Sequence, residues 1–410
     1  MRCLLGTAAA CWAALAAARA ACADGVMLPV TVEVGRSTKA VASPRQEAVL
    51  ATDGRTVQVV LRTHFRSGPK ELAWIVPVPA RPERVEKADG GLFRRLEELT
   101  APRFLVTTGG TGPPFACGCG AAGGEAPHVA GRSVVVESSG TAGIFEYVVL
   151  SATKADDLTA WLNEHRYLVP VGAERVFARY VADRWHWLAM RVRPGAGEAG
   201  TLAPHPVRYT YRDSRLIYPL EISRLSADLT NEIVLYVVAG GRRACGNWHN
   251  AVVDPSRVAR DPASASGTNY ERLLGGLCEA RRGRVFVTEL ARTGRVFGHE
   301  DDSRQINGVL DAALLKALGS DQTLTRLRAI MTPRAMDRDV ALLPAATWEP
   351  VSNTFDLSAA DGPPGAIALA LPLLPLAAAG VGLRLLDGRG RRRAAALACL
   401  AAACVAAAVM

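Results

Sequence analysis

Two apolar segments at opposite ends of the 410-residue chain set the limits within which a folded body can form. Residues 1–23 carry Arg2, then an uncharged stretch, then the small-residue site Ala21-Cys22-Ala23, a pattern typical of a cleaved signal peptide. Residues 365–383 contain 19 residues without a charge, about the length that a helix needs to cross a bilayer. We therefore expect residues 24–346 to be an exported body.

The residues after the second apolar segment indicate its orientation. The basic loop 384–393 should remain cytoplasmic, because arginines beside a span stay inside. Residues 394–410 form either a possible second transmembrane helix or an interfacial segment, and a removed C-terminal sorting tail is a further alternative. The expected location is the cell membrane, with the body in the periplasm or on the cell surface. The expected partners are the membrane, through the C-terminal helix, and an unknown protein or envelope component.

The net charge of +9 does not indicate a nucleic-acid partner. The first 23 residues contribute +2 and residues 365–410 contribute +4, which leaves +3 for the rest of the chain. Nucleic-acid binding needs a concentrated basic face, and the body has no basic run. We therefore expect no nucleic acid among the partners.

The body is predicted to be an antiparallel β-rich α+β domain with a few inserted helices. Short alternating runs predict most of the strands, and Asp53-Gly54 predicts a hairpin turn. The expected helices cover residues 90–102, 154–167, 174–184, 306–318 and 321–331. Residues 109–132 read as a flexible Gly/Pro/Cys-rich insert, a sub-boundary is possible near 255, and residues 347–364 read as a polar stalk.

The sequence carries no catalytic motif. It has no H-E-x-x-H helix, no G-x-S-x-G elbow, no P-loop and no dinucleotide-binding fingerprint, so no catalytic residue and no cofactor is predicted. The seven histidines are scattered without ligand spacing. Trp185 and Trp187 would lie on one strand face, where core packing is favoured over a binding surface.

Four cysteines are the remaining candidates for chemistry. Cys117, Cys119, Cys245 and Cys278 make an even number in an exported body, which predicts two disulfides with three possible pairings. A direct bridge between Cys117 and Cys119 would be strained and easily reduced. The same two thiolates are also weak candidates for binding a soft metal such as Cu(I). Structural disulfides are favoured over redox or metal chemistry.

Several stretches resemble a known family. "ELAWIVPVPARPE" (71–83) with "LFRRLEELTAP" (92–102), "GIFEYVVLSATKADDLTAWLNEHRYLVP" (143–170) and "YPLEISRLSA" (218–227) are similar to an uncharacterised exported bacterial family, domain of unknown function 2330. The residues that carry the resemblance are Trp74, Pro77, Pro79, Phe93, Thr100, Trp161, Leu162, Tyr167 and Pro170. The chain departs from the family pattern at Cys22-Ala23-Asp24-Gly25 and at His165-Arg166-Tyr167. The resemblance implies export but no catalytic residues.

Three functions follow from these observations. The favoured one is an exported, membrane-anchored and non-catalytic binding or envelope-associated module. The alternatives are a redox or metal-handling protein that uses Cys117 and Cys119, and a hydrolase whose site has no familiar motif. A pocket with converging carboxylates or a Ser/His pair would favour the hydrolase.

Overall fold

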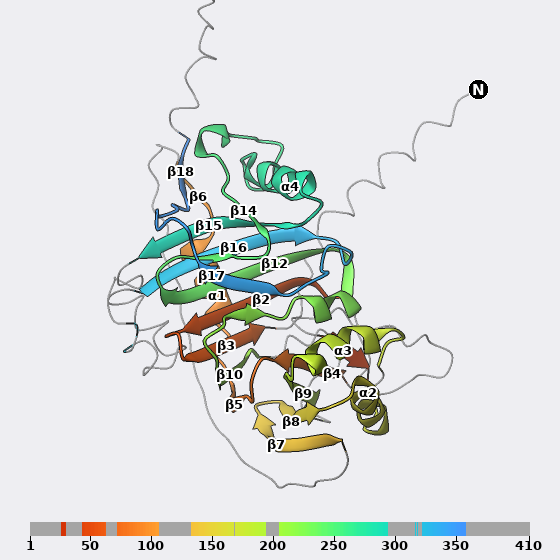
Figure 1. Cartoon of the computed structure of the whole chain (residues 1–410). Helices are drawn as coiled ribbons and strands as arrows, with labels where there is room; N and C mark the ends of the chain where they lie inside the picture. Colours follow the sequence, from red (N-terminus) through yellow and green to blue (C-terminus); the bar gives the residue numbers. More distant parts are fainter. Residues whose placement is uncertain are drawn as a thin grey trace, which may run out of the picture. The chain divides into compact units, whose positions relative to one another are not determined.

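The computed structural model describes residues 26–29, 43–62, 72–105, 133–167, 169–193, 205–293, 316, 318 and 322–357. Within these residues the protein is rich in strands, most of them antiparallel, and has four α-helices (Figure 1). The prediction of a β-rich α+β body is therefore confirmed. All of the described residues lie in one compact unit, which spans 1–360.

The largest sheet has eight strands. Their order is β14 (His249–Ala251), β15 (Val285–Thr293), β16 (Gln322–Met331), β12 (Ala227–Gly240), β2 (Ser43–Thr52), β3 (Thr56–Arg62), β10 (Val207–Arg212) and β5 (Glu83–Lys87). Two neighbouring pairs, β14 with β15 and β12 with β2, are parallel. The predicted turn between β2 and β3 is present: Gly54 has a φ of +88°, which a side chain would disfavour, and Asp53 Oδ1 accepts from the Thr56 amide.

A second sheet has five antiparallel strands. Their order is β1 (Val26–Pro29), β4 (Leu72–Val78), β9 (His186–Val192), β8 (Phe145–Ala152) and β7 (Val134–Ala142). One face of this sheet packs on one face of the eight-stranded sheet: Trp74 and Met190 share a buried cluster with Leu50, Val59 and other residues of β2, β3 and β10. Because side chains alternate along a strand, the opposite faces of both sheets remain to be covered.

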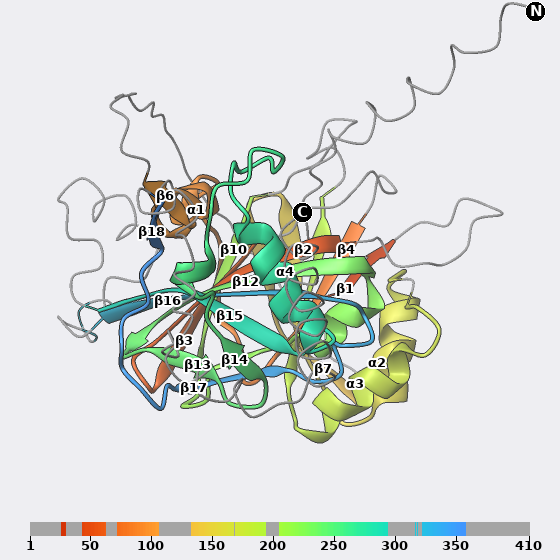
Figure 2. The ribbon, with the colours of Figure 1, turned by 90° about the horizontal axis from the view of Figure 1, so that it is seen from above.

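Helices cover these outer faces. α2 (Ala155–Glu164) and α3 (Ala173–Ala182) lie side by side against the five-stranded sheet, where Phe177 packs edge-on to Trp187 (Figure 2). α1 (Leu92–Thr100) packs Phe93 on the eight-stranded sheet near Tyr236, and α4 (Tyr270–Ala280) packs on β15. Each helix has apolar residues at helical spacing on its buried side, as an amphipathic surface helix requires.

Smaller elements complete the unit. β11 (Ile217–Tyr218), β17 (Val340–Pro344) and β13 (Arg243–Cys245) form a three-stranded sheet, and β6 (Arg103–Leu105) pairs in parallel with β18 (Thr354–Asp356). Two 3₁₀ turns span Glu221–Leu225 and Pro255–Arg257.

The helix predicted over 321–331 is wrong. The segment is β16, an inner strand between β15 and β12. Its side chains alternate between two buried faces: Leu327 and Ala329 enter the core between the sheets, whereas Arg326 and Arg328 meet carboxylates on the other face. The strand alternation is hard to recognise in the sequence because an arginine normally indicates a solvent-exposed position, whereas these arginines are buried.

Two boundaries differ from those predicted. The chain does not divide near 255, because β14 before this point and β15 after it belong to the same sheet as β2 and β3. The stalk predicted to begin at 347 is in part folded: Val351 exchanges two backbone hydrogen bonds of 2.9 Å with Ala291, and Phe355 and Leu357 are buried. We call residues 347–357 the strap.

The segments predicted as signal peptide, insert, transmembrane helices and basic loop lie outside the described residues. In the part of the chain that the structure describes, no helix is long and apolar enough to span a bilayer.

Candidate functional site

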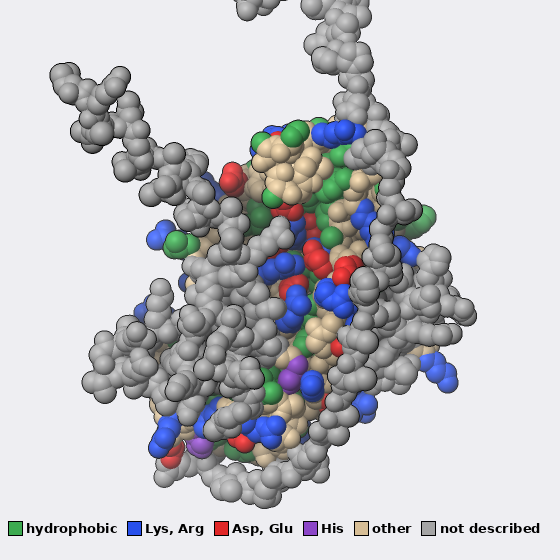
Figure 3. All heavy atoms as spheres, turned by 180° about the vertical axis from the view of Figure 1, so that it is seen from behind, with side chains coloured by type: hydrophobic (Ala, Val, Ile, Leu, Met, Phe, Trp, Pro, Cys, Tyr) green, Lys and Arg blue, Asp and Glu red, His purple; other side chains and the backbone are tan. Residues whose placement is uncertain are grey.

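A ladder of charged side chains crosses one face of the eight-stranded sheet between α1 and α4. Its arginines are Arg45, Arg62, Arg326 and Arg328, and its carboxylates are Glu47, Glu97, Glu232, Glu271 and Glu289. The strand residues share this face because they lie at even spacings from Val49, Val60, Val234 and Leu324, which pack under α1. Figure 3 shows basic and acidic side chains gathered in a stripe on this side of the molecule.

Arg326 and Glu289 form the buried centre of the ladder. Arg326 Nε lies 2.7 Å from Glu289 Oε2, with side-chain exposures of 1% and 0%, although the orientation of these two atoms does not make a hydrogen bond. Arg326 also contacts Glu97 at 2.9 Å, and Arg328 lies between Glu232, Glu271 and Glu289. Burial disfavours the charged form of Glu97, but Arg326, Arg45 and the Tyr236 hydroxyl together outweigh this effect and lower the pKa of that carboxyl.

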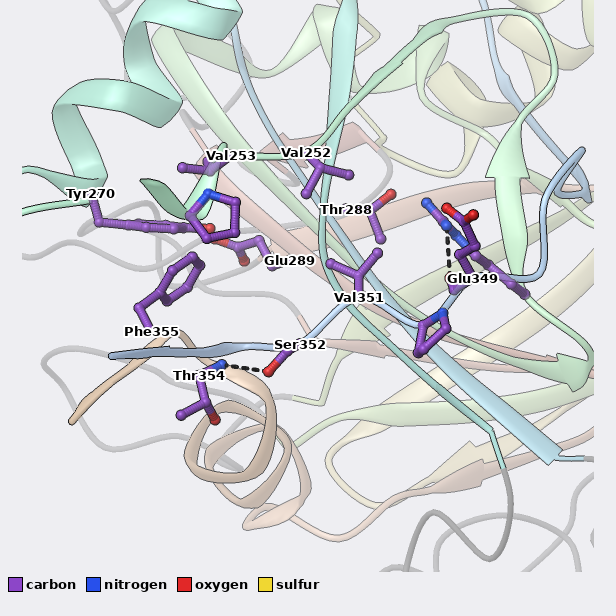
Figure 4. Close-up of a pocket in the computed structure, with 13 residues that line it drawn as sticks. Val252, Val253, Tyr270, Thr288, Glu289, Glu349, Val351, Ser352, Thr354 and Phe355 are labelled. Carbon is purple, nitrogen blue, oxygen red and sulfur yellow. Dashed lines mark hydrogen bonds between the residues drawn. The ribbon is translucent and has the colours of Figure 1, made fainter. Parts of the chain in front are cut away.

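A pocket of about 280 Å³ opens at the α4 end of the ladder, and we call it the strap pocket. Glu289, Thr288 and Tyr270 lie on its sheet side, Val252, Val253 and Pro255 form a second wall, and Pro350, Val351 and Phe355 of the strap form a third (Figure 4). At its edge, the Arg242 guanidinium donates to the Glu349 carbonyl oxygen at 2.9 Å. The pocket therefore combines apolar walls with a few fixed polar groups, which is typical of ligand sites.

The buried carboxylate of the strap pocket, Glu289, is not available as a catalytic base. The Tyr270 hydroxyl donates to Glu289 Oε1 at 3.1 Å, and Arg326 and Arg328 both contact this carboxylate. Burial, followed by the adjacent Glu289 charge, raises the pKa of the Tyr270 hydroxyl, so the phenol stays protonated. A general base must be free to accept a proton, so the pocket is better suited to binding than to proton transfer.

A second pocket, of about 510 Å³, lies at one end of the five-stranded sheet, and we call it the histidine pocket. Its lining includes Glu137, Ser151, Trp185 and His186. The Ser151 hydroxyl donates to Glu137 Oε1 at 2.7 Å, and Ser151 pairs with His186 across β8 and β9. This is a Ser/His pair of the kind that would favour a hydrolase. The serine proton, however, is directed to a carboxylate and not to the imidazole.

The described cysteines are separate buried thiols. Cys245 lies in the core between the sheets, Cys278 lies on the buried side of α4, and both are free. Desolvation raises the pKa of both thiols, which opposes formation of the reactive thiolate. Cys117 and Cys119 lie outside the described residues, so the pairings and the metal site predicted for them remain predictions. Among the described residues, no group of three His, Cys, Asp or Glu side chains could hold a metal ion.

Apart from Trp185, sequence reasoning missed the residues of both pockets. The expected packing role is confirmed for Trp185 and Trp187, which are at most 3% exposed. The available signal for the ladder was the alternation of Arg326 and Arg328 with Leu327 and Ala329, which indicates a strand with one charged face. The residues of the histidine pocket come from separate strands that only the fold brings together.

Comparison with known proteins gives a family but no activity. No curated protein matches the chain. Among solved structures, baculovirus P35 matches at 13% identity and a TM-score of 0.30 over 52% of this chain and 66% of that chain. A mutated baculovirus P35 after caspase cleavage matches at 10% identity and a TM-score of 0.28 over 50% and 68%. These likenesses carry no inference about this protein.

A family model matches most of the chain and includes the Trp74 and Trp161 stretches. By this match over residues 17–296, the chain belongs to a family of uncharacterized proteins conserved in bacteria, domain of unknown function 2330.

Proposed function

We propose that this protein is an exported, membrane-anchored binding module of the cell envelope, and that the strap pocket is its binding site. The observation that carries the proposal is the position of the strap. It forms one wall of the pocket, and only seven residues separate its last buried residue, Leu357, from the charge-free segment 365–383. An anchored chain would therefore hold the pocket within about 25 Å of the membrane surface, the reach of so short a linker.

The chemistry of the pocket supports binding over catalysis. Glu289 is held by Tyr270, Arg326 and Arg328, and Glu349 lies at the exposed edge. Val253 and Phe355 form buried, apolar parts of the pocket wall. An apolar group of a partner that packs against them would be removed from water, which favours binding. The partner expected here is a protein or another envelope component with an apolar group that fits a cavity of about 280 Å³.

Export and anchoring are tested with reporter fusions in a bacterial host. Alkaline phosphatase, which is active only after export, is fused after residue 364 or after residue 393, and the same junctions are made with a cytoplasmic fluorescent protein. We expect phosphatase activity only from the 364 junction and fluorescence only from the 393 junction. Equal fluorescence from both junctions would contradict the proposal.

Binding is tested by co-purification from membranes with the full chain. Val252, 45% exposed on the pocket wall, is changed to Arg to fill the pocket with a charge, and Val171, 97% exposed and part of neither pocket, is changed to Arg as the control. A partner recovered with the wild type and the control, but not with Val252→Arg, would support the strap pocket as its site. Equal recovery with both variants would argue against it.

A further inference from the structure

We propose that the histidine pocket is a second binding site, and that it takes a neutral polyhydroxylated ligand, such as a sugar unit, without cleaving it. This inference does not depend on the strap pocket or on membrane anchoring. It rests on the strand register, the hydrogen-bonding groups in the pocket and the balance of charge around it.

Strand register brings the polar groups of the pocket together. Val135 pairs with Ser151, and Ser151 pairs with His186, so the three side chains form one row across β7, β8 and β9. The register shifts between Val136 and Ser138, which makes Glu137 the extra residue of a β-bulge. Bulges redirect side chains at sheet edges, and this one allows Glu137 to reach the Ser151 hydroxyl at 2.7 Å.

The pocket offers both acceptors and donors. A carboxylate has about four acceptor sites, and Ser151 occupies one of those on Glu137, so the others remain for ligand hydroxyl groups. Desolvation lowers the pKa of His186, although Glu137 opposes this effect. The ring is therefore neutral at pH 7, and because its Nδ1 atom is buried, Nε2 is the ring atom left to exchange a hydrogen bond with a ligand. Ser133 and Thr153 lie exposed in the same lining.

The charges around the pocket act in opposite senses on an ion of either sign. Glu137 attracts a cation that Arg184 repels, and Arg184 attracts an anion that Glu137 repels, so the two effects partly cancel. Arg81 adds a second positive charge close by, because its guanidinium donates to the Glu137 carbonyl oxygen at 3.1 Å and its charge acts on His186. A neutral ligand that exchanges hydrogen bonds avoids both repulsions.

Apolar surface completes the site. Trp185 is 3% exposed and is held against Tyr180, with ring centroids 5.0 Å apart, so its ring is a rigid part of the lining. Val135, Ala152 and Val181 provide further apolar surface. A cavity of about 510 Å³ lies within the range for small-molecule sites and accommodates one or two sugar rings.

The same geometry argues against hydrolysis. A nucleophilic serine needs a base that takes its proton during attack. The Ser151 hydroxyl has one proton and donates it to Glu137, so it cannot at the same time donate to His186. The Nδ1 atom of His186 is buried and has no hydrogen-bond partner, so no carboxylate orients this ring as it does in a catalytic triad.

The test uses the full chain in phospholipid nanodiscs and saturation-transfer NMR. The probes are glucose, glucosamine and glucuronate, which share one ring and differ in charge. We expect transfer to glucose with a Kd on the order of 1 mM, and binding of both charged probes at least about tenfold weaker. Val135→Phe should weaken glucose binding by at least about tenfold, because the larger ring fills the pocket. Val171→Phe, at a residue that is 97% exposed and lines neither pocket, should leave it unchanged.

Glu137→Gln keeps the shape of the side chain and removes its charge. We expect it to weaken glucose binding by about tenfold, since a charge-assisted hydrogen bond becomes a neutral one, without loss of fold by circular dichroism. No saturation transfer to glucose, equal binding by Val135→Phe and Val171→Phe, tighter binding of either charged sugar, or release of glucose from cellobiose would each overturn the proposal.

Discussion

Arg326 Nε lies 2.7 Å from Glu289 Oε2 in the middle of the eight-stranded sheet, and neither side chain is more than 1% exposed. The pair joins β16 to β15 at the point where the ladder meets the strap pocket. Two charges removed from water lose hydration, and their attraction offsets this loss only when the other polar groups around them are also satisfied. Tyr270, Arg328 and Glu97 supply those contacts.

Removing one partner of this pair should destabilise the protein strongly. Arg326→Met leaves the Glu289 carboxylate buried without one of the positive charges that offset its lost hydration. We therefore expect a loss of about 3–5 kcal/mol in the free energy of unfolding. Arg94→Met is the control: Arg94 pairs with Glu98 at 2.9 Å, but both side chains are more than half exposed, so the loss should be below about 0.5 kcal/mol. Urea denaturation of both variants measures the difference. Equal losses of unfolding free energy in the two variants would show that burial does not increase the contribution of the pair to stability.

Asp339 should make stability depend on pH. Its Oδ1 accepts from the Tyr180 hydroxyl at 2.7 Å and from the Glu221 amide at 2.9 Å, and burial raises its pKa to about 6. Between the ordinary value of 3.8 and about 6, the folded state binds more protons than the unfolded state. Stability should therefore fall as the pH rises through this window. Burial also raises the pKa of Glu221, which adds to the same trend.

The variant Asp339→Asn isolates this contribution. Its free energy of unfolding should exceed that of the wild type by on the order of 1–3 kcal/mol at pH 8 and by little at pH 4, because the amide does not ionise. Asp337→Asn is the control two residues away. Hydrogen bonds from Arg338, and also from Arg284, lower the pKa of Asp337 to about 2, so loss of this carboxylate should give no gain at pH 8. The measurement is the urea midpoint of each protein from pH 4 to pH 8. If the midpoint changed with pH in the same way for the wild type and Asp339→Asn, Asp339 would not be the source of the pH dependence.

The strap should contribute to the stability of the body. Phe355 is 6% exposed and stacks on Phe104 at 5.7 Å, so Phe355→Ala should cost about 3–5 kcal/mol. Trp348 is 83% exposed, and Trp348→Ala should change stability by less than about 0.5 kcal/mol. Thermal unfolding of the two variants provides the comparison. If Phe355→Ala had as little effect as Trp348→Ala, residues 347–357 would not contribute to the body, as expected for part of the polar stalk that the sequence indicated.

The two described thiols should resist modification in the folded protein. Burial raises the pKa of both Cys245 and Cys278, so iodoacetamide should label them only after unfolding. Alkylation before and after urea treatment, followed by peptide mass spectrometry without reductant, measures this directly. Recovery of either residue in a disulfide-linked peptide would favour the pairings that the even cysteine count suggested.

Local patterns in the sequence were sufficient for most elements of the body. The β2–β3 hairpin, α1, α2 and α3 were predictable because a turn dipeptide or helical apolar spacing marks each of them within a few residues. β16 was not, because Arg326 and Arg328 hide their burial until their glutamate partners on β12, β15 and α4 are known. The strap was obscured by its polar, turn-rich composition, in which only Phe355 and Leu357 carry the packing signal.

The candidate sites were less predictable than the fold. Cys117 and Cys119 could be recognised as a candidate pair because only Gly118 separates them in the sequence. Glu289 and Tyr270 are 19 residues apart, and Ser151 and His186 are brought together only by strand register. Residues that meet only through non-local pairing show no characteristic spacing in a single sequence. The pockets therefore could not be predicted until the fold was known.

Photo-crosslinking in cells would decide whether the strap pocket binds a partner. Benzoylphenylalanine replaces Val252 at the strap pocket, and in separate strains it replaces Val135 at the histidine pocket or Val171, which is 97% exposed and lines neither pocket. We expect a discrete crosslinked species from position 252 in the membrane fraction, absent from position 171 and lost when Phe355→Ala is added. The same species from positions 252 and 171, or none from position 252, would be incompatible with binding at the strap pocket.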